Sequence, residues 1–219
     1  MATANQRIGE TLTLKNVRLA FPNVFSPRAM KDEKTGEARK RFDATFIFGP
    51  QHEAFAATQQ AIIKVAKQKW GDDKGLAYAK ALLQRDQTCL HNGDLKALKY
   101  DGFAGNWYVS ASNRTRPAVV HCVKDPATGK AKVLTEADGV IYAGCYVNAI
   151  IEVYPFEGRE GKKDGIYATL LGIQFAADGD AFGGRTASPD DFEAFDALPE
   201  GAPAPWEDKA SGAAVESLV

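Results

Sequence analysis

The sequence predicts one mainly-β domain with a helical insertion and an acidic C-terminal tail. Three observations lead to this fold class. Apolar side chains alternate along several segments, their period becomes helical over residues 52–70, and the composition changes after residue 185. Strand side chains point to opposite faces with period two, whereas helical faces recur every three to four residues. A length of 219 residues suits one decorated domain or two small ones.

The strand around which we expect the sheet to form is predicted at residues 139–154. One parity is apolar and the other carries tyrosines and polar groups. The apolar set is Ile141, Ala143, Cys145, Val147, Ala149, Ile151 and Val153, and the other set includes Tyr142, Tyr146, Asn148, Glu152 and Tyr154. An outward row of aromatic rings is costly in water unless something flat covers it. We interpret Tyr142 and Tyr146 as a stacking platform for unpaired bases.

The N-terminal segments predict two strands and a loop. Residues 11–21 alternate with a change of parity, which indicates either a β-bulge near Lys15 and Asn16 or a strand break. Residues 22–40 contain two prolines and many charges and predict a mobile loop. Residues 41–48 alternate cleanly and predict the second strand.

A helical excursion and a second group of strands are predicted next. Residues 52–70 and 75–84 have helical periodicity, and we expect their lysines to face solvent. β-Character returns over residues 88–121, followed by a turn at residues 124–130 that contains proline and glycine. Residues 166–176 predict a last long strand, which an exposed basic loop joins to the preceding one.

The net charge of −1 conceals an uneven distribution. Residues 1–185, the predicted folded domain, contain 26 Lys and Arg against 20 Asp and Glu. Residues 186–219 contain one Lys against eight acids and many prolines and alanines, which predicts a disordered tail. A basic body with an acidic appendage is typical of nucleic-acid binders, although a neutral enzyme with a solvated tail has the same pattern.

Several function classes find no support in the sequence. Phosphate-binding glycine loops, HExxH and GxSxG are absent. No apolar run approaches the roughly 20 residues that span a bilayer, so no membrane partner is expected. Three cysteines without a CxxC pair fit a reducing cytoplasm. We predict no cofactor. The catalytic alternative is a metal-dependent nuclease that uses Asp178 and Asp180, or Cys89, His91, His121 and Cys122.

Cations near the tyrosines extend the predicted nucleic-acid surface. Aromatic faces hold unpaired bases, and cations follow the phosphates. The candidate stacking residues are Tyr108, Tyr142 and Tyr146; Lys96, Lys99, Tyr100 and Phe103 form the lip of the groove; and Arg114, Arg116, Lys162 and Lys163 meet phosphates together with the two lip lysines. Tyrosines in strands also pack beneath helices, and this alternative stays open.

Four segments give the chain a resemblance to a known family: NVRLAFPNVFSP, GNWYVSASNRTRP, IYAGCYVNA and LLGIQFAADGDAFGG. In this order, and over most of residues 11–184, they resemble tailed-phage and prophage single-stranded-DNA-binding proteins. The resemblance implies an OB-fold, a five-stranded Greek-key barrel. It also implies a non-catalytic, sequence-tolerant protein that coats single-stranded DNA in phage replication, recombination or repair, in the cytoplasm of a bacterial host. The site residues above rest on parity and charge alone.

The tail is similar to those of replication single-strand binders, which commonly end acidic. Such tails dock on polymerases, helicases or nucleases, or compete with DNA for the groove. Many end in phenylalanine, whereas this one ends Glu216-Ser217-Leu218-Val219. Replication or recombination proteins are therefore expected partners, and a protein-interaction module acting through the tail is a third alternative. The sequence leaves the number of protomers open, with a homodimer among the alternatives.

Overall fold

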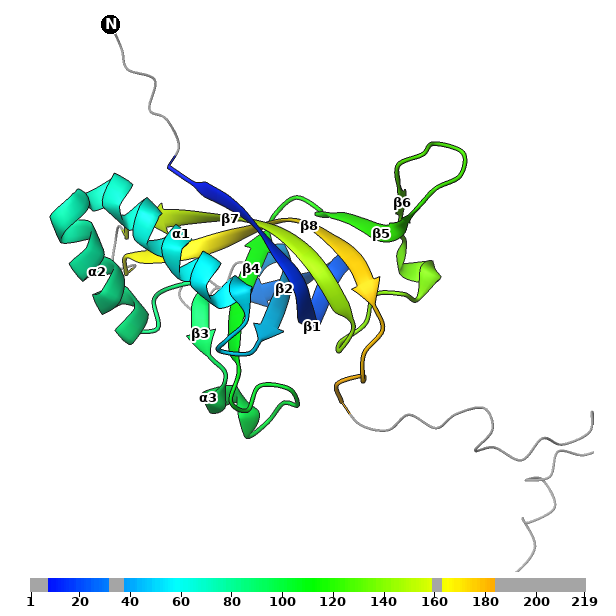
Figure 1. Ribbon diagram of the computed structural model, residues 1–219, viewed down its shortest axis with the longest axis horizontal. Helices are drawn as coiled ribbons and strands as arrows, with labels where there is room; N and C mark the ends of the chain where they lie inside the picture. The colour runs from blue at the N-terminus through cyan, green and yellow to red at the C-terminus, as the bar shows by residue number, and fades with distance from the viewer. Residues whose placement is uncertain (1–7, 32–37, 159–162, 184–219) are drawn as a thin grey trace, which may run out of the picture. The chain divides into compact units, whose positions relative to one another are not determined.

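Five strands of the chain close into a barrel (Figure 1). The computed structural model describes residues 8–31, 38–158 and 163–183. The barrel strands are β1 (Glu10–Lys31), β2 (Ala38–Phe48), β4 (Trp107–Asn113), β7 (Tyr146–Phe156) and β8 (Gly165–Ala177). They pair in the order β4-β2-β1-β7-β8, and a parallel pairing of β4 with β8 closes the ring. This closed, five-stranded topology confirms the expected OB-fold.

A β-bulge in β1 explains the change of parity in the sequence. The register between β1 and β7 shifts between Leu14 and Val17, and Asn16 has a φ of 50°. The extra residue turns both Leu14 and Val17 into the core, where neither is exposed. The predicted bulge near Lys15 and Asn16 is therefore confirmed.

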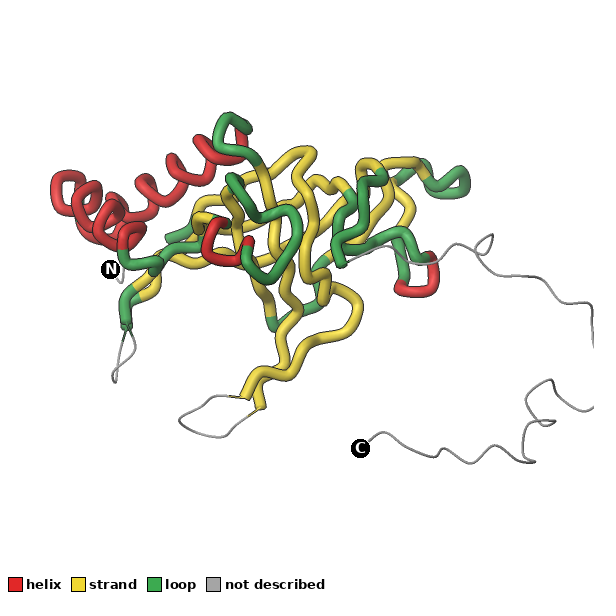
Figure 2. Tube along the Cα trace, turned by 90° about the horizontal axis from the view of Figure 1, so that it is seen from below, coloured by secondary structure: helices red, strands yellow, loops and turns green. Residues whose placement is uncertain are grey.

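The mobile loop predicted at residues 22–40 is wrong for residues 22–31 and 38–40, and residues 32–37 lie outside the described chain. β1 continues to Lys31, and β2 begins at Ala38, so the two strands extend as a ribbon (the yellow arm that runs downward in Figure 2). The β1–β2 register shifts twice between Ala20 and Arg28, and these irregularities accommodate the two prolines. We call this ribbon, with its pairs from Arg28↔Arg41 to Lys31↔Ala38, the β1–β2 arm.

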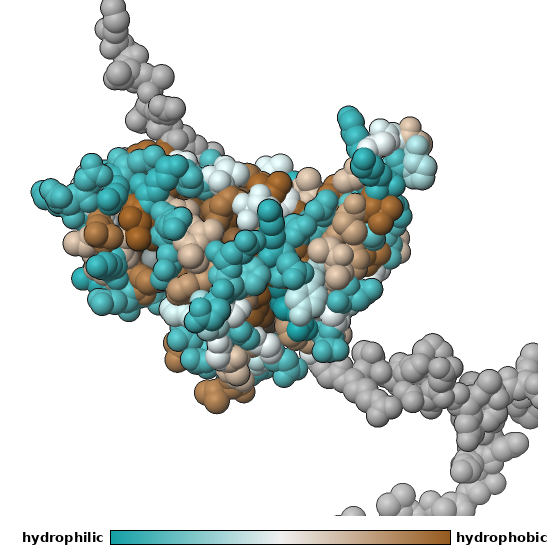
Figure 3. All heavy atoms as spheres, in the orientation of Figure 1, coloured by the Kyte–Doolittle hydropathy of each residue, from teal (hydrophilic) through white to brown (hydrophobic). Residues whose placement is uncertain are grey.

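Two helices form the predicted insertion between β2 and β4. They are α1 (Glu53–Trp70) and α2 (Asp72–Gln84), which pack against each other, and α1 lies against β1 and β7. Gly71, with a φ of 87°, ends α1 and donates its N–H to the Lys67 carbonyl. Figure 3 shows a mostly hydrophilic outer surface over these helices, as the sequence predicts. No helix among the described residues has the length and apolarity to cross a membrane.

The central strand is shorter than predicted because residues 139–145 form a loop. Gly144 has a φ of 112°, and a Cβ atom there would lie 2.1 Å from the Asp180 carbonyl oxygen. This close contact holds the loop against the end of β8. From Tyr146 onwards the alternation is confirmed, since the side chains of Val147 and Val153 are fully buried in the barrel core.

Short elements decorate the barrel. They are β3 (Leu90–Asn92), α3 (Asp94–Ala97), β5 (Ala118–Lys124), β6 (Ala131–Val133) and the 3₁₀-helix η1 (Glu136–Asp138). β5 and β6 form a hairpin whose turn confirms the one predicted at residues 124–130. Strands, helices and this hairpin all belong to the unit Met1–Gly184. The predicted tail lies outside the described residues.

Candidate nucleic-acid interface

An open groove of about 770 Å³ crosses the outer face of β2 and β4. The strands are paired there through Asp43↔Ser112 and Thr45↔Ser110, and all four side chains line the groove. Larger side chains of the other parity point inward, and the paired Phe46 and Val109 are fully buried in the core. The period of two therefore gives this pair of strands an apolar inner face and a polar outer face. In OB-folds, the face of the second and third strands and the loops beside it bind oligonucleotides.

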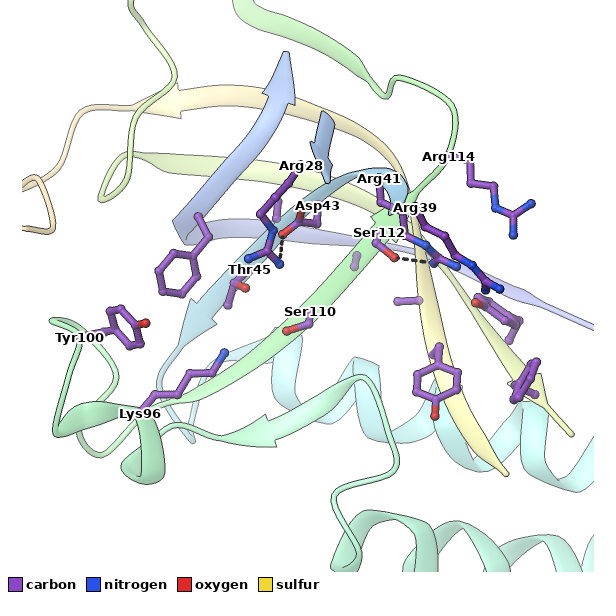
Figure 4. A pocket seen from close by; sticks show the side chains of 17 residues that line it. Arg28, Arg39, Arg41, Asp43, Thr45, Lys96, Tyr100, Ser110, Ser112 and Arg114 are labelled. Carbon is purple, nitrogen blue, oxygen red and sulfur yellow. Dashed lines mark hydrogen bonds and ion pairs between the residues drawn. The ribbon is translucent and has the colours of Figure 1, made fainter. Parts of the chain in front are cut away.

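Five cations line this groove, and three of them come from the β1–β2 arm. They are Arg28, Arg39, Arg41, Lys96 and Arg114 (Figure 4). Arg28 and Arg41 are direct partners in the arm, although like charges facing each other across a ladder are destabilising. The Arg41 Nη1 donates to the Ser112 Oγ at 3.2 Å, which holds one of the two guanidinium groups against the groove. A polyanion bound here would relieve the repulsion.

Aromatic rings and Lys96 form one end of the groove. The rings of Phe21 and Tyr100 lie 4.9 Å apart, nearly perpendicular, and Tyr100 is 47% exposed. Phe21 has a φ of 50°, which is strained for a residue other than glycine and is frequent at functional sites. The Lys96 Nζ lies 4.3 Å from the centroid of the Tyr108 ring. Burial lowers the Lys96 pKa and raises the Tyr108 pKa to about 12.

A second aromatic group comes from the stretch of β7 and β8 where Tyr154 pairs with Tyr167. The Tyr167 ring centroid lies 6.5 Å from that of Tyr154 and 6.0 Å from that of Phe156. All three rings line the groove, and Tyr167 is more than one-third exposed. Figure 4 shows Thr45, Ser110 and Ser112 between Lys96 and Tyr100 on one side and Arg39, Arg41 and Arg114 on the other. The groove thus combines stacking surfaces with cations, the two features that hold single strands.

Some of the residues predicted from the sequence come together here, and others lie beneath the groove. Lys96, Tyr100 and Arg114 line it together. Tyr108 and Phe103 are buried under the α3 segment, which corrects their predicted position on the surface. Their rings, 5.3 Å apart, instead support Lys96 from below.

The two tyrosines that the sequence suggested as a platform lie elsewhere. Tyr142 is in the loop before β7, so the two residues do not share a strand. The Tyr142 hydroxyl lies 3.0 Å from the Asp178 Oδ1 and accepts the Gly179 N–H, and burial raises its pKa. The Arg18 guanidinium covers the Tyr146 ring at 5.1 Å. Neither tyrosine lines the groove.

The remaining predicted cations are dispersed. The Arg116 guanidinium lies 5.6 Å from the centroid of the Phe25 ring. Lys99 lines a smaller apolar cavity of about 330 Å³ between the α3 segment and Phe182. Lys163 is exposed, and Lys162 lies outside the described residues.

Sequence reasoning missed the arm arginines because their segment was interpreted as a loop. One signal was available: Arg39 and Arg41 have the parity of Asp43 and Thr45, opposite to the apolar side chains of the same strand. They therefore had to share the outer face once the strand was extended to Ala38.

The side chains suggested for a nuclease do not form a metal-binding group. Within residues 8–31, 38–158 and 163–183, no three His, Cys, Asp or Glu side chains gather in a way that would hold a metal. Cys89 is buried, which raises its pKa to about 12. The Asp178 carboxylate contacts the Tyr142 hydroxyl.

The chain is similar to phage proteins in sequence and in fold. The family model described as the ssDNA-binding protein of Enterobacter phage Enc34 matches residues 10–202. Putative protein p50 of Acyrthosiphon pisum secondary endosymbiont phage 1 is 40% identical over 185 residues, which cover 83% of this chain and 92% of p50.

Two solved structures share the fold at low sequence identity. The single-stranded DNA-binding protein from bacteriophage Enc34 in complex with ssDNA is 20% identical, has a TM-score of 0.59, and is aligned over 82% of this chain and 96% of that one. The C-terminal truncation of the Enc34 protein is 19% identical, with a TM-score of 0.57 and coverages of 83% and 96%.

Proposed function

This chain belongs to the family of the Enterobacter phage Enc34 single-stranded-DNA-binding protein, and on that premise we propose that it binds single-stranded DNA in the groove across β2 and β4. The observation that carries the proposal is the groove itself, which gathers five cations and two aromatic groups around the strand pair that OB-folds use for oligonucleotides. The protein acts on DNA during phage replication, recombination or repair in the cytoplasm of the bacterial host.

The geometry suggests how a strand is held. Phosphates meet the arginines of the β1–β2 arm and Arg114, and bases stack on exposed rings at the two ends, such as Tyr100 and Tyr167. Stacking on an aromatic ring is tolerant of sequence because every base has a π-face. This binding mode needs no cofactor and no chemical step, so the proposed role is a non-catalytic coat. The acidic tail would recruit replication or recombination proteins.

A salt titration of oligonucleotide binding tests the proposal. Fluorescein-labelled dT20 should bind without metal, with an affinity that falls as salt rises. Each phosphate contact on a single strand contributes about −0.7 to the slope of log K against log salt. Five groove cations therefore predict a slope of up to about −3.5. Absence of binding would refute the proposal, and magnesium-dependent cleavage of the oligonucleotide would favour the nuclease alternative.

A further inference from the structure

A carboxylate lies on the floor of this cationic groove. Asp43 projects from β2 beside the paired Ser112 of β4, and it lines the groove together with the arginines (Figure 4). A fixed negative charge beside a phosphate-binding surface weakens its attraction for a polyanion. Phosphate binding alone therefore does not account for an acid at this position.

Asp43 also has an unused hydrogen-bond acceptor. Its Oδ2 accepts from the Asn23 Nδ2 at 3.3 Å and lies 3.5 Å from the Arg28 Nη2. Its Oδ1 is buried and accepts no hydrogen bond. Pairing with Arg28 involves the Oδ2 atom only, and the Arg28 side chain in this pair is 55% exposed. A buried carboxylate oxygen without a donor is costly. The Asp43 side chain is 19% exposed and lines the groove, so a ligand there can supply a donor to this carboxylate.

The surroundings of Asp43 suit the edge of a base. Three hydroxyl side chains, Thr45, Ser110 and Ser112, form the rest of the polar floor and can donate or accept. Tyr100 and Lys96 stand on one side of this floor, and Arg39, Arg41 and Arg114 on the other (Figure 4). The carboxylate therefore lies among hydroxyl groups on the same surface as the stacking rings.

We propose that the Asp43 carboxylate accepts a hydrogen bond from the exocyclic amino group of a base, so that the groove prefers cytosine or adenine over thymine at one position. This inference rests on the proposed binding of single-stranded DNA. A carboxylate accepts from cytosine N4, whereas thymine presents the O4 acceptor at the same place and is repelled. In a single strand these Watson–Crick edges are unpaired and available.

Competition between dC15 and dT15 at pH 8 and constant salt tests this preference. The wild-type protein should bind dC15 about fivefold or more tightly than dT15, the lower end of what a good base contact discriminates. In Asp43→Asn the two affinities should agree within about twofold, because the amide can present either a donor or an acceptor. Asp101→Asn removes the same charge outside the groove lining and should keep the wild-type ratio.

The outcomes separate this inference from the proposed function. If wild-type protein binds dC15 and dT15 equally, or if Asp43→Asn keeps the preference, the inference is wrong while DNA binding stands. If neither oligonucleotide binds, the proposed function fails as well. If Asp43→Asn does not fold, a wild-type measurement replaces it: an oligonucleotide of 2-pyrimidinone, which lacks the 4-amino group, should lose the advantage of dC15, and retention of that advantage would overturn the inference.

Discussion

Replacing Arg41 with glutamine should weaken DNA binding without weakening the fold. Arg41 is one of five cations in the groove, so its loss should reduce the salt slope by about 0.7, from about −3.5 to about −2.8. Between 50 and 200 mM salt, the wild-type affinity for dT20 should then fall about 130-fold, and that of the variant about 50-fold.

The stability of this variant follows from two opposing local effects. Arg41→Gln removes the repulsion from Arg28 across the arm, of roughly 0.2–1 kcal/mol, and loses the hydrogen bond to Ser112, of roughly 0.5–1.5 kcal/mol. We therefore expect the free energy of unfolding to change by less than about 1 kcal/mol.

Fluorescence anisotropy over the salt series gives the slope, and urea denaturation gives the stability. Lys80→Gln is the matched control, because it removes one positive charge from the exposed face of α2 and leaves the groove intact. It should retain the wild-type slope. An Arg41→Gln slope equal to that of the control would refute the assignment of Arg41 to a phosphate.

Two further predictions separate the surface of the groove from what lies beneath it. Tyr100→Ala should weaken dT20 binding by about 1–3 kcal/mol with little change in stability, because we propose that this exposed ring stacks a base. Phe103→Ala should instead lower the free energy of unfolding by about 3–5 kcal/mol, because its ring is buried. Fluorescence anisotropy measures the affinity, and urea denaturation measures the stability. A Tyr100→Ala variant that loses stability but not affinity, or a Phe103→Ala variant that keeps its stability, would contradict the positions assigned to these rings. The free energy of unfolding should fall as the pH rises from about 10 towards 12, because burial raises the pKa of folded Tyr108 to about 12, so the folded state keeps a proton that the unfolded chain loses. Tyr108→Phe should show a shallower fall in denaturation experiments between pH 9 and 11.5, and an equal fall would contradict it.

The regular parts of the fold could be predicted from the sequence because local patterns determine them. Residues 41–48 alternate without interruption, and α1 has a clear helical period and ends at Gly71. The bulge near Asn16 could be inferred because two apolar parities in one strand must reach one core.

The errors arose where distant contacts override the local pattern. The prolines of residues 22–40 indicated a loop, but both fall at irregularities of β1, where a missing N–H costs no ladder hydrogen bond. The alternation of residues 139–145 indicated a strand, but the backbone turns at Gly144 to pack against Asp180. No pattern within either segment reveals its partner.

Errors about the site followed from those about the fold. Tyr142 and Tyr146 were chosen as a platform because an extended strand would display both on one face, which the loop prevents. Tyr108 does have the outer parity that the sequence gives it, but α3 and Phe103 cover it. The period of a strand tells which face a side chain takes, and only the tertiary fold tells what covers that face.

The parallel junction of β4 and β8 closes the barrel beside the proposed DNA-binding groove. Within the described chain this junction has a single register pair, Ser112 with Thr169, reinforced by the Asn113 amide on the Leu170 carbonyl. Ser112 and Tyr167 line the groove from opposite sides of the junction, so a strand bound there as proposed would contact both edges. Because a ligand of the closed form disfavours opening, deuterium uptake at these backbone amides reports occupancy of the groove. Slower exchange at these amides with DNA present is therefore the expected sign of a strand bound across the β4–β8 junction.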